Sequence, residues 1–125
     1  MSKNLEEIGL KSIYDRYDLF FIDIWGVIHN GINLNSNSIE VLENLSKENK
    51  NFVLLTNAPR PNAVVVNFLK KMGLKNFFEN VFTSGEASLK YLINDLNDKN
   101  FFHIGPNRDF DLFKSFQKNK VSNIN

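Results

Sequence analysis

Short apolar runs that alternate with amphipathic helical patterns constrain the fold of this chain more than any other feature of its sequence. A continuous apolar run is typical of a strand that is buried on both faces of a sheet. The segments between the runs carry apolar residues at helical spacing. Strands that alternate with helices predict parallel pairing with right-handed crossovers, and therefore an α/β, doubly wound, Rossmann-like parallel sheet. The predicted strands are Asp18–Ile24, Asn51–Thr56, Val81–Thr83 and Asn100–Ile104.

The segments between these strands contain residues that are typical of helix starts. Asn37 with Glu40, and Thr83 with Glu86, have the spacing of an N-cap residue and its partner. Pro61 suits the first turn of a helix. Each predicted strand is therefore followed by a predicted helix, and one helix precedes the first strand. The helices are expected over Leu5–Tyr14, after Asn37, after Pro61, after Thr83 and from near Arg108, the last one burying Phe110, Phe113 and Phe116.

Composition describes an ordinary globular domain. The chain has 125 residues, of which 42% are hydrophobic and 23% charged, and no internal boundary divides residues 1–125. Its 15 basic and 14 acidic residues give a net charge of +1, so we expect neither a nucleic acid nor a membrane surface as a partner. Cysteine is absent, which excludes disulfides, thiolate catalysis and cysteine-based zinc sites. No secretory signal or long apolar segment is seen, so a cytoplasmic location is expected.

The carboxyl ends of the strands are the expected working edge of this sheet, because ligands of doubly wound sheets bind there. Asp23 comes late in the most apolar strand, where an unpaired carboxylate is costly to bury. A carboxylate beside exposed backbone N–H groups suits covalent phosphoryl transfer. The residues alone leave a second interpretation open, a helix-capping or hydrogen-bonded Asp23. The segments at this edge are 23–26, 56–60, 84–86 and 105–108.

Four segments at this edge resemble motifs of the haloacid dehalogenase-like hydrolases. Residues 21–31, Phe-Ile-Asp-Ile-Trp-Gly-Val-Ile-His-Asn-Gly, resemble the first motif in the Asp-x-Trp-Gly-Val form of subclass IIA. Residues 54–60 are similar to the second motif, and residues 83–87 and 103–109 are similar to later segments. The resemblance runs from about Tyr17 to Asp109. It implies the N-terminal half of a haloacid dehalogenase-like core without its cap domain.

The resemblance also implies roles for individual residues. Asp23 would be the nucleophile that forms an aspartyl-phosphate. Mg²⁺ would be held by a carboxylate oxygen of Asp23 and the backbone carbonyl of Trp25, a hard-oxygen set that suits this ion. Gly26, Thr56 and Asn57 would bind the phosphoryl group. The implied reaction is Mg²⁺-dependent hydrolysis of a small phosphomonoester. The residues expected around the substrate are Trp25, His29 and Arg60.

Two departures from the family pattern lead to a second hypothesis. Trp25 stands where the family usually has an acid/base Asp, and no Lys motif or acidic motif follows Arg108. We therefore expect the chain by itself to be an inactive or weakly active fragment. The alternative is a non-catalytic phosphometabolite-binding or regulatory protein on the same scaffold. A receiver-type signalling domain fits less well, because it needs an acidic pair where Trp25 stands. Homo-oligomer formation stays open.

Overall fold

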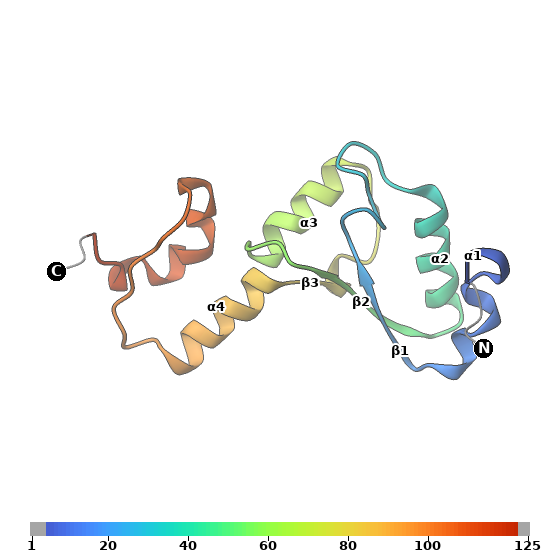
Figure 1. Ribbon diagram of the computed structural model, residues 1–125, viewed down its shortest axis with the longest axis horizontal. Helices are drawn as coiled ribbons and strands as arrows, with labels where there is room; N and C mark the ends of the chain where they lie inside the picture. Colours follow the sequence, from blue (N-terminus) through green and yellow to red (C-terminus); the bar gives the residue numbers. More distant parts are fainter. Residues whose placement is uncertain (1–4, 123–125) are drawn as a thin grey trace. The chain divides into compact units, whose positions relative to one another are not determined.

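The computed structural model describes residues 5–122, except for the side chains of residues 6, 110, 111 and 115–118. It consists of two compact units, Met1–Leu55 and Thr56–Asn125. Within the described residues, no helix combines the length and the apolar character needed to span a membrane. The first unit contains α1 (Leu5–Ile8), η1 (Leu10–Ser12), η2 (Tyr14–Arg16), β1 (Leu19–Asp23), α2 (Ser36–Lys47) and most of β2 (Asn51–Thr56) (Figure 1). The second contains α3 (Asn62–Lys71), η3 (Phe78–Asn80), β3 (Val81–Thr83), α4 (Ser84–Asp95) and η4 (Asn107–Asn119).

The three strands form a sheet in the order β1-β2-β3, which confirms the predicted α/β fold class. β1 and β2 run parallel, and their register places Leu19 opposite Asn51 and Asp23 opposite Leu55. The connection from β1 to β2 passes through α2, as a parallel pair requires. The interior of the first unit is made of buried aliphatic and aromatic side chains. These are Ile24, Ile28, Leu42, Leu45, Phe52 and Leu54.

The prediction that β1 is buried on both faces is wrong. Phe20 and Ile22 are partly buried, whereas Leu19 is exposed and Phe21 keeps 68% of its surface exposed. β1 is the end strand of the sheet, and its side chains alternate between a covered face and an open one. An apolar run indicates that a strand could be buried on both faces. Burial also requires another element to pack on each face, and one face of β1 has no such cover.

Helix starts were predicted with mixed success. α2 is capped by Asn35 and not by Asn37, because the Asn35 side chain accepts from the backbone N–H groups of Asn37 at 3.2 Å and Ser38 at 3.4 Å. The predicted opening helix breaks into α1, η1 and η2, since Gly9 adopts φ 68° after the first turn. The predicted cap at Thr83 is confirmed.

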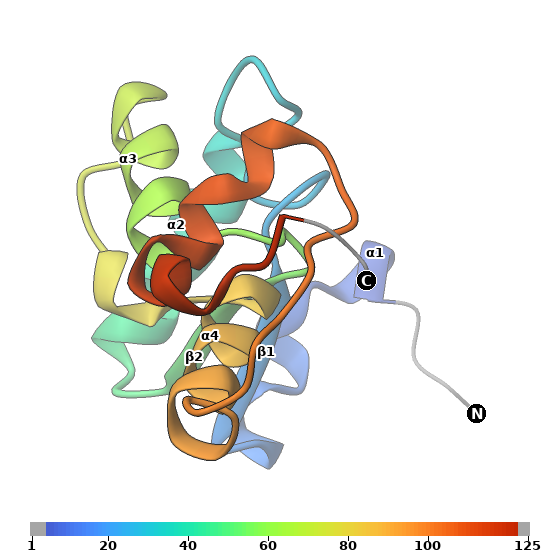
Figure 2. The ribbon, with the colours of Figure 1, turned by 90° about the vertical axis from the view of Figure 1, so that its left-hand side faces the viewer.

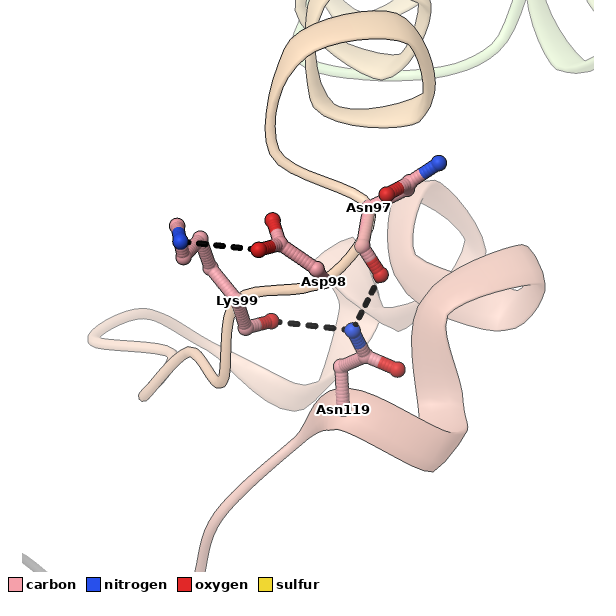
Figure 3. A network of polar contacts seen from close by, with 4 residues as sticks. All are labelled: Asn97, Asp98, Lys99 and Asn119. Carbon is pink, nitrogen blue, oxygen red and sulfur yellow. Dashed lines mark hydrogen bonds and ion pairs between the residues drawn. The ribbon is translucent and has the colours of Figure 1, made fainter.

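The predicted strand Asn100–Ile104 is also wrong. An extended segment joins α4 to η4 (Figure 2), and its hydrogen bonds go to the end of η4. The Phe101 N–H donates to the Asn119 carbonyl at 2.9 Å, and the Val121 N–H donates to the Phe101 carbonyl at 2.9 Å. The Asn119 amide donates to the carbonyls of Asn97 at 2.7 Å and Lys99 at 2.9 Å (Figure 3). The Phe101 backbone groups, which a fourth sheet strand would need, are thus bonded to residues at the end of η4 and just after it.

Of the apolar residues predicted to be buried by the last helix, Phe113 is partly buried and its ring centroid lies 5.0 Å from that of Phe101. The side chains of Phe110 and Phe116 lie outside the described residues.

The start of α4 is tied to the start of α3 by side-chain hydrogen bonds. Thr83 Oγ1 accepts from the Glu86 N–H at 2.9 Å and donates to the Arg60 carbonyl. The Glu86 carboxylate accepts from the Asn62 N–H at 3.1 Å, while the Asn62 side chain accepts from the Thr83 N–H at 2.9 Å. The predicted capping box is therefore shared between two helices: Glu86 caps α3 and not its own helix.

Gly85 allows this close approach. Its N–H donates to the Ala58 carbonyl at 3.1 Å, and a Cβ at this position would overlap the Arg60 backbone. No side chain larger than hydrogen fits against that backbone without movement of the segment.

We therefore predict that Gly85→Ala destabilises the protein by about 1–3 kcal/mol, because the new methyl group forces the Arg60 backbone to move. Helix propensity alone predicts the opposite sign, a gain of about 0.5–1 kcal/mol. Urea unfolding measures the change in free energy. Asn94→Ala, an exposed substitution in the same helix, is the matched control and should stay within about 0.5 kcal/mol of wild type. A stabilised Gly85→Ala protein would contradict the packing.

Candidate functional site

Asp23 is the last residue of β1, and its side chain is exposed. Its Oδ1 atom accepts a hydrogen bond from the Ile24 N–H at 2.8 Å, which orients the carboxylate at the carboxyl end of the strand. Alternation along β1 puts Asp23 on the same face as Leu19 and Phe21. The carboxylate is thus held by the backbone and open to a ligand.

The segment after Asp23 folds into a tight loop that is closed by its own backbone. The N–H groups of Ile28 and His29 donate to the Ile24 carbonyl at 2.8 and 3.3 Å, and the Gly26 N–H donates to the His29 carbonyl at 2.7 Å. Gly26 has φ 80°, a conformation that residues with a side chain rarely adopt. The Gly26 N–H, which the sequence predicted to bind phosphate, is used here to close the loop.

Trp25 lies on the outside of this loop with 66% of its surface exposed. Its indole nitrogen is 3.9 Å from the point where a Cβ on Gly31 would lie. Ile32, 79% exposed, and Val27 add further apolar surface to the same loop. Ile32, an apolar residue among asparagines, was not among the residues expected around the substrate.

His29 lies inside the loop and is buried. Its Nδ1 atom accepts a hydrogen bond from the Gly31 N–H at 2.9 Å, so the imidazole is neutral with its proton on Nε2. Burial lowers the pKa of His29 below its ordinary value of 6.5. This geometry supports a structural role in the loop, and a role of His29 at the substrate stays a prediction.

The loop after β2 belongs to the second unit. Thr56 is buried, and its hydroxyl oxygen accepts from the Ala58 N–H at 3.3 Å. Asn57 is exposed, and its carbonyl accepts from the Ser84 hydroxyl at 2.9 Å. Together with the Gly85 contact, this bond anchors the loop on the start of α4. Thr56 and Asn57, two of the three residues predicted to bind phosphate, thus lie on a loop that the start of α4 anchors.

Arg60 joins two of the recognised segments within the second unit. One of its guanidinium nitrogens lies 4.0 Å from a carboxylate oxygen of Asp109, and Nε of Arg108 lies 3.9 Å from the same oxygen. The Arg60 charge is therefore partly neutralised by Asp109. An anionic substrate would compete with that carboxylate for Arg60.

The two oxygen donors predicted for Mg²⁺, the Asp23 carboxylate and the Trp25 backbone carbonyl, would bind this ion only weakly by themselves. Within the part of the chain that the structure describes, no three His, Asp or Glu side chains gather in a way that could hold a metal. Asp23 is an exposed carboxylate, and the Trp25 carbonyl is two residues away in the chain. Mg²⁺ is commonly bound through one or two carboxylates with waters and substrate phosphate. The residues present therefore fit Mg²⁺ only with such additional oxygen ligands.

The buried state of His29 predicts a pH dependence of stability. Because its folded pKa lies below 6.5, the unfolded chain takes up the proton more readily than the folded chain. The free energy of unfolding should thus hold above pH 6.5 and decline as the pH falls through the folded pKa. Urea unfolding between about pH 7.5 and about pH 5 tests this against His29→Gln, which does not titrate. Equal pH slopes for the two proteins would disprove the prediction.

The chain is similar in sequence and fold to known hydrolases. The sequence profile described as "Haloacid dehalogenase-like hydrolase" matches residues 20–117. No curated protein matches the chain. Among solved structures, a haloacid dehalogenase-like hydrolase from Brucella suis is 31% identical, with a TM-score of 0.68 over 84% of this chain and 38% of its own. A putative nagD protein is 29% identical, with a TM-score of 0.66 over 81% of this chain and 40% of its own.

A 4-nitrophenylphosphatase from Thermotoga maritima is 28% identical, with a TM-score of 0.67 over 82% of this chain and 40% of its own. This chain thus spans about two fifths of the length of these solved relatives. Because the profile matches most of the sequence, and because the nagD-type relatives share the fold, the chain belongs to the haloacid dehalogenase-like hydrolase family, in the subclass IIA branch that its motifs predicted.

Proposed function

We propose that this chain carries the nucleophile of a Mg²⁺-dependent phosphomonoester hydrolase, and that Asp23 is that nucleophile. The observation that supports this most is the exposed Asp23 carboxylate at the carboxyl end of β1, oriented by the Ile24 N–H. One of the solved relatives is a 4-nitrophenylphosphatase, a hydrolase of a small phosphomonoester. The proposed substrate is accordingly a small phosphomonoester, and the proposed compartment is the cytoplasm.

In the proposed reaction, a carboxylate oxygen of Asp23 attacks phosphorus, and the ester P–O bond breaks with its electron pair on the leaving oxygen, which takes a proton from water. Water then attacks the aspartyl-phosphate, and phosphate and the Asp23 carboxylate are released. The Ile24 N–H holds the carboxylate in place, and the Thr56 hydroxyl and Asn57 N–H are proposed to bind the phosphoryl oxygens. Mg²⁺, held by Asp23 and the Trp25 carbonyl, would offset the negative charge of the phosphoryl group. Trp25 cannot supply the leaving group with a proton.

The alternative function is binding of a phosphometabolite without turnover. Two observations favour it: the indole at position 25, and the absence of a metal-binding cluster among the residues that the structure describes. General acid–base help is commonly worth about 10²–10⁴ in rate, so its loss leaves a slow reaction or none. We therefore propose that the chain by itself is weakly active at most.

Asp23→Asn separates the two functions. We expect it to reduce Mg²⁺-dependent release of 4-nitrophenol from 4-nitrophenyl phosphate on the order of 10³-fold, because an amide is a poor nucleophile. Asp18→Asn, an exposed carboxylate just before the same strand, should leave the rate unchanged. If the wild-type chain releases no product yet binds inorganic phosphate, the binding function replaces the catalytic one.

Trp25→Asp tests the cause of the expected low activity. The substitution places a carboxylate two residues after Asp23, where it can protonate the leaving group. We expect the turnover number with an alkyl phosphomonoester, whose leaving oxygen needs a proton, to rise on the order of 10²-fold. Because the Trp25 side chain is exposed, the loop should fold with either residue. Trp25→Phe is the control for loss of the indole. An equal gain in Trp25→Phe would show that the indole obstructs the site and that proton transfer is not the limitation.

A further inference from the structure

The loop that follows Asp23 presents large apolar side chains to solvent next to the proposed nucleophile. Trp25 is 66% exposed and Ile32 is 79% exposed. The Trp25 indole nitrogen lies 3.9 Å from the point where a Cβ on Gly31 would stand, so the ring reaches across the loop to the backbone that carries Ile32. Two residues of chain span at most about 7 Å, which keeps the Trp25 backbone close to Asp23. We call Trp25 and Ile32 the apolar rim.

Hydrogen bonds hold the backbone under the apolar rim. The Asn30 side chain accepts from the N–H groups of Ile32 at 2.9 Å and Asn33 at 2.8 Å. The Asn30 N–H donates to the Asn33 carbonyl at 3.1 Å, and the Gly31 N–H donates to Nδ1 of His29 at 2.9 Å. Because these bonds fix the backbone on both sides of Ile32, a ligand that contacts the rim does not have to order the loop first.

The same loop lacks an acid that could protonate a leaving group. Residues 24–35 contain no Asp, Glu, Lys, Arg or Tyr, and their only titratable side chain is His29. His29 is buried, and burial lowers its pKa, so the imidazole stays neutral and is a poor proton donor. An ester that reacts at Asp23 with the help of these residues must therefore release an oxygen that leaves without a proton.

The acidity of the departing alcohol decides which esters meet this condition. A phenol such as that of tyrosine has a pKa of about 10, whereas an alkanol is about as weak an acid as water, whose pKa is about 15.7. When Asp23 bonds to phosphorus, the P–O bond to a phenol breaks with its electron pair on the phenolic oxygen, and the phenolate takes a proton from water after it departs. An alkoxide is far more basic and is released much more slowly.

We propose that the apolar rim binds the aromatic ring of an aryl phosphomonoester, so that this chain prefers phenolic esters to alkyl esters. The inference rests on the proposed role of Asp23 as the nucleophile. Two independent observations support one substrate class: the rim offers an indole and an aliphatic side chain for a ring to pack on, and the loop lacks the proton donor that an alkyl ester needs. Contact between two aromatic rings is commonly worth about two- to tenfold in affinity.

Binding is tested with two phosphonates, which this reaction does not cleave, in the presence of Mg²⁺. Trp25 is the only tryptophan of the chain, so its fluorescence reports on the rim. Phenylphosphonate should bind about two- to tenfold more tightly than methylphosphonate by calorimetry, and it should shift the Trp25 emission more. Ile32→Ala and Trp25→Leu should bring the two affinities closer together. Ile93→Ala, which replaces an exposed isoleucine on α4, is the matched control and should keep the wild-type ratio.

Catalysis gives a second readout, the kcat/KM values for phenyl phosphate and methyl phosphate. Ile32→Ala should lower the value for phenyl phosphate about two- to tenfold and leave that for methyl phosphate unchanged, which a general loss of folding would not do. Equal affinities of the wild-type chain for the two phosphonates overturn the proposal, and so does an Ile32→Ala protein that keeps the wild-type preference. If the chain cleaves neither ester but still prefers phenylphosphonate, binding at the rim stands and catalysis at Asp23 is what fails.

Discussion

The parallel pairing of β1 with β2 is the interaction on which the rest of the structure depends. Its register sets Asp23 opposite Leu55, so both strands end at the same level and the loop after each begins there. The pairing requires a crossover, and α2 supplies it with its own cap at Asn35. A slip of one residue would turn Asp23 to the other face and Ile22 to the open one. The position proposed for the Asp23 nucleophile thus depends on the backbone hydrogen bonds between β1 and β2.

Each of the two loops after these strands is stabilised in a different way. The loop after β1 is closed by its own backbone and by the buried His29, with Gly26 in a conformation that only glycine adopts readily. The loop after β2 depends on its neighbour, because Ser84 and Gly85 hold it through the carbonyls of Asn57 and Ala58. Loops anchored by hydrogen bonds suit the phosphoryl transfer that we propose, since that reaction relies on positioned groups more than on covalent chemistry.

Prediction from sequence succeeded where the signal is local. The bounds of β2 and β3 were predicted as they are observed, and Thr83 caps α4 as expected. Prediction failed where hydrogen bonds to residues distant in sequence determine the local structure. Asn100–Ile104 has the composition of a strand, but its backbone bonds to residues 119 and 121. Asn37 has the right spacing for a cap, but Asn35, which lies before the helix, is the cap and accepts from the N–H groups of Asn37 and Ser38.

The sequence by itself determined the family, the α/β class and the candidate residues at the strand ends, because motif spacing and apolar periodicity are properties of neighbours in the chain. Only the tertiary structure decided which of those groups stay accessible. In the folded chain the Gly26 N–H is bonded inside the loop and Arg60 is paired with Asp109. Phe21 and Leu19 stay exposed. The physical reason is that hydrogen bonds and burial depend on which segments meet in space, and a strand's apolar side chains do not specify what will cover them.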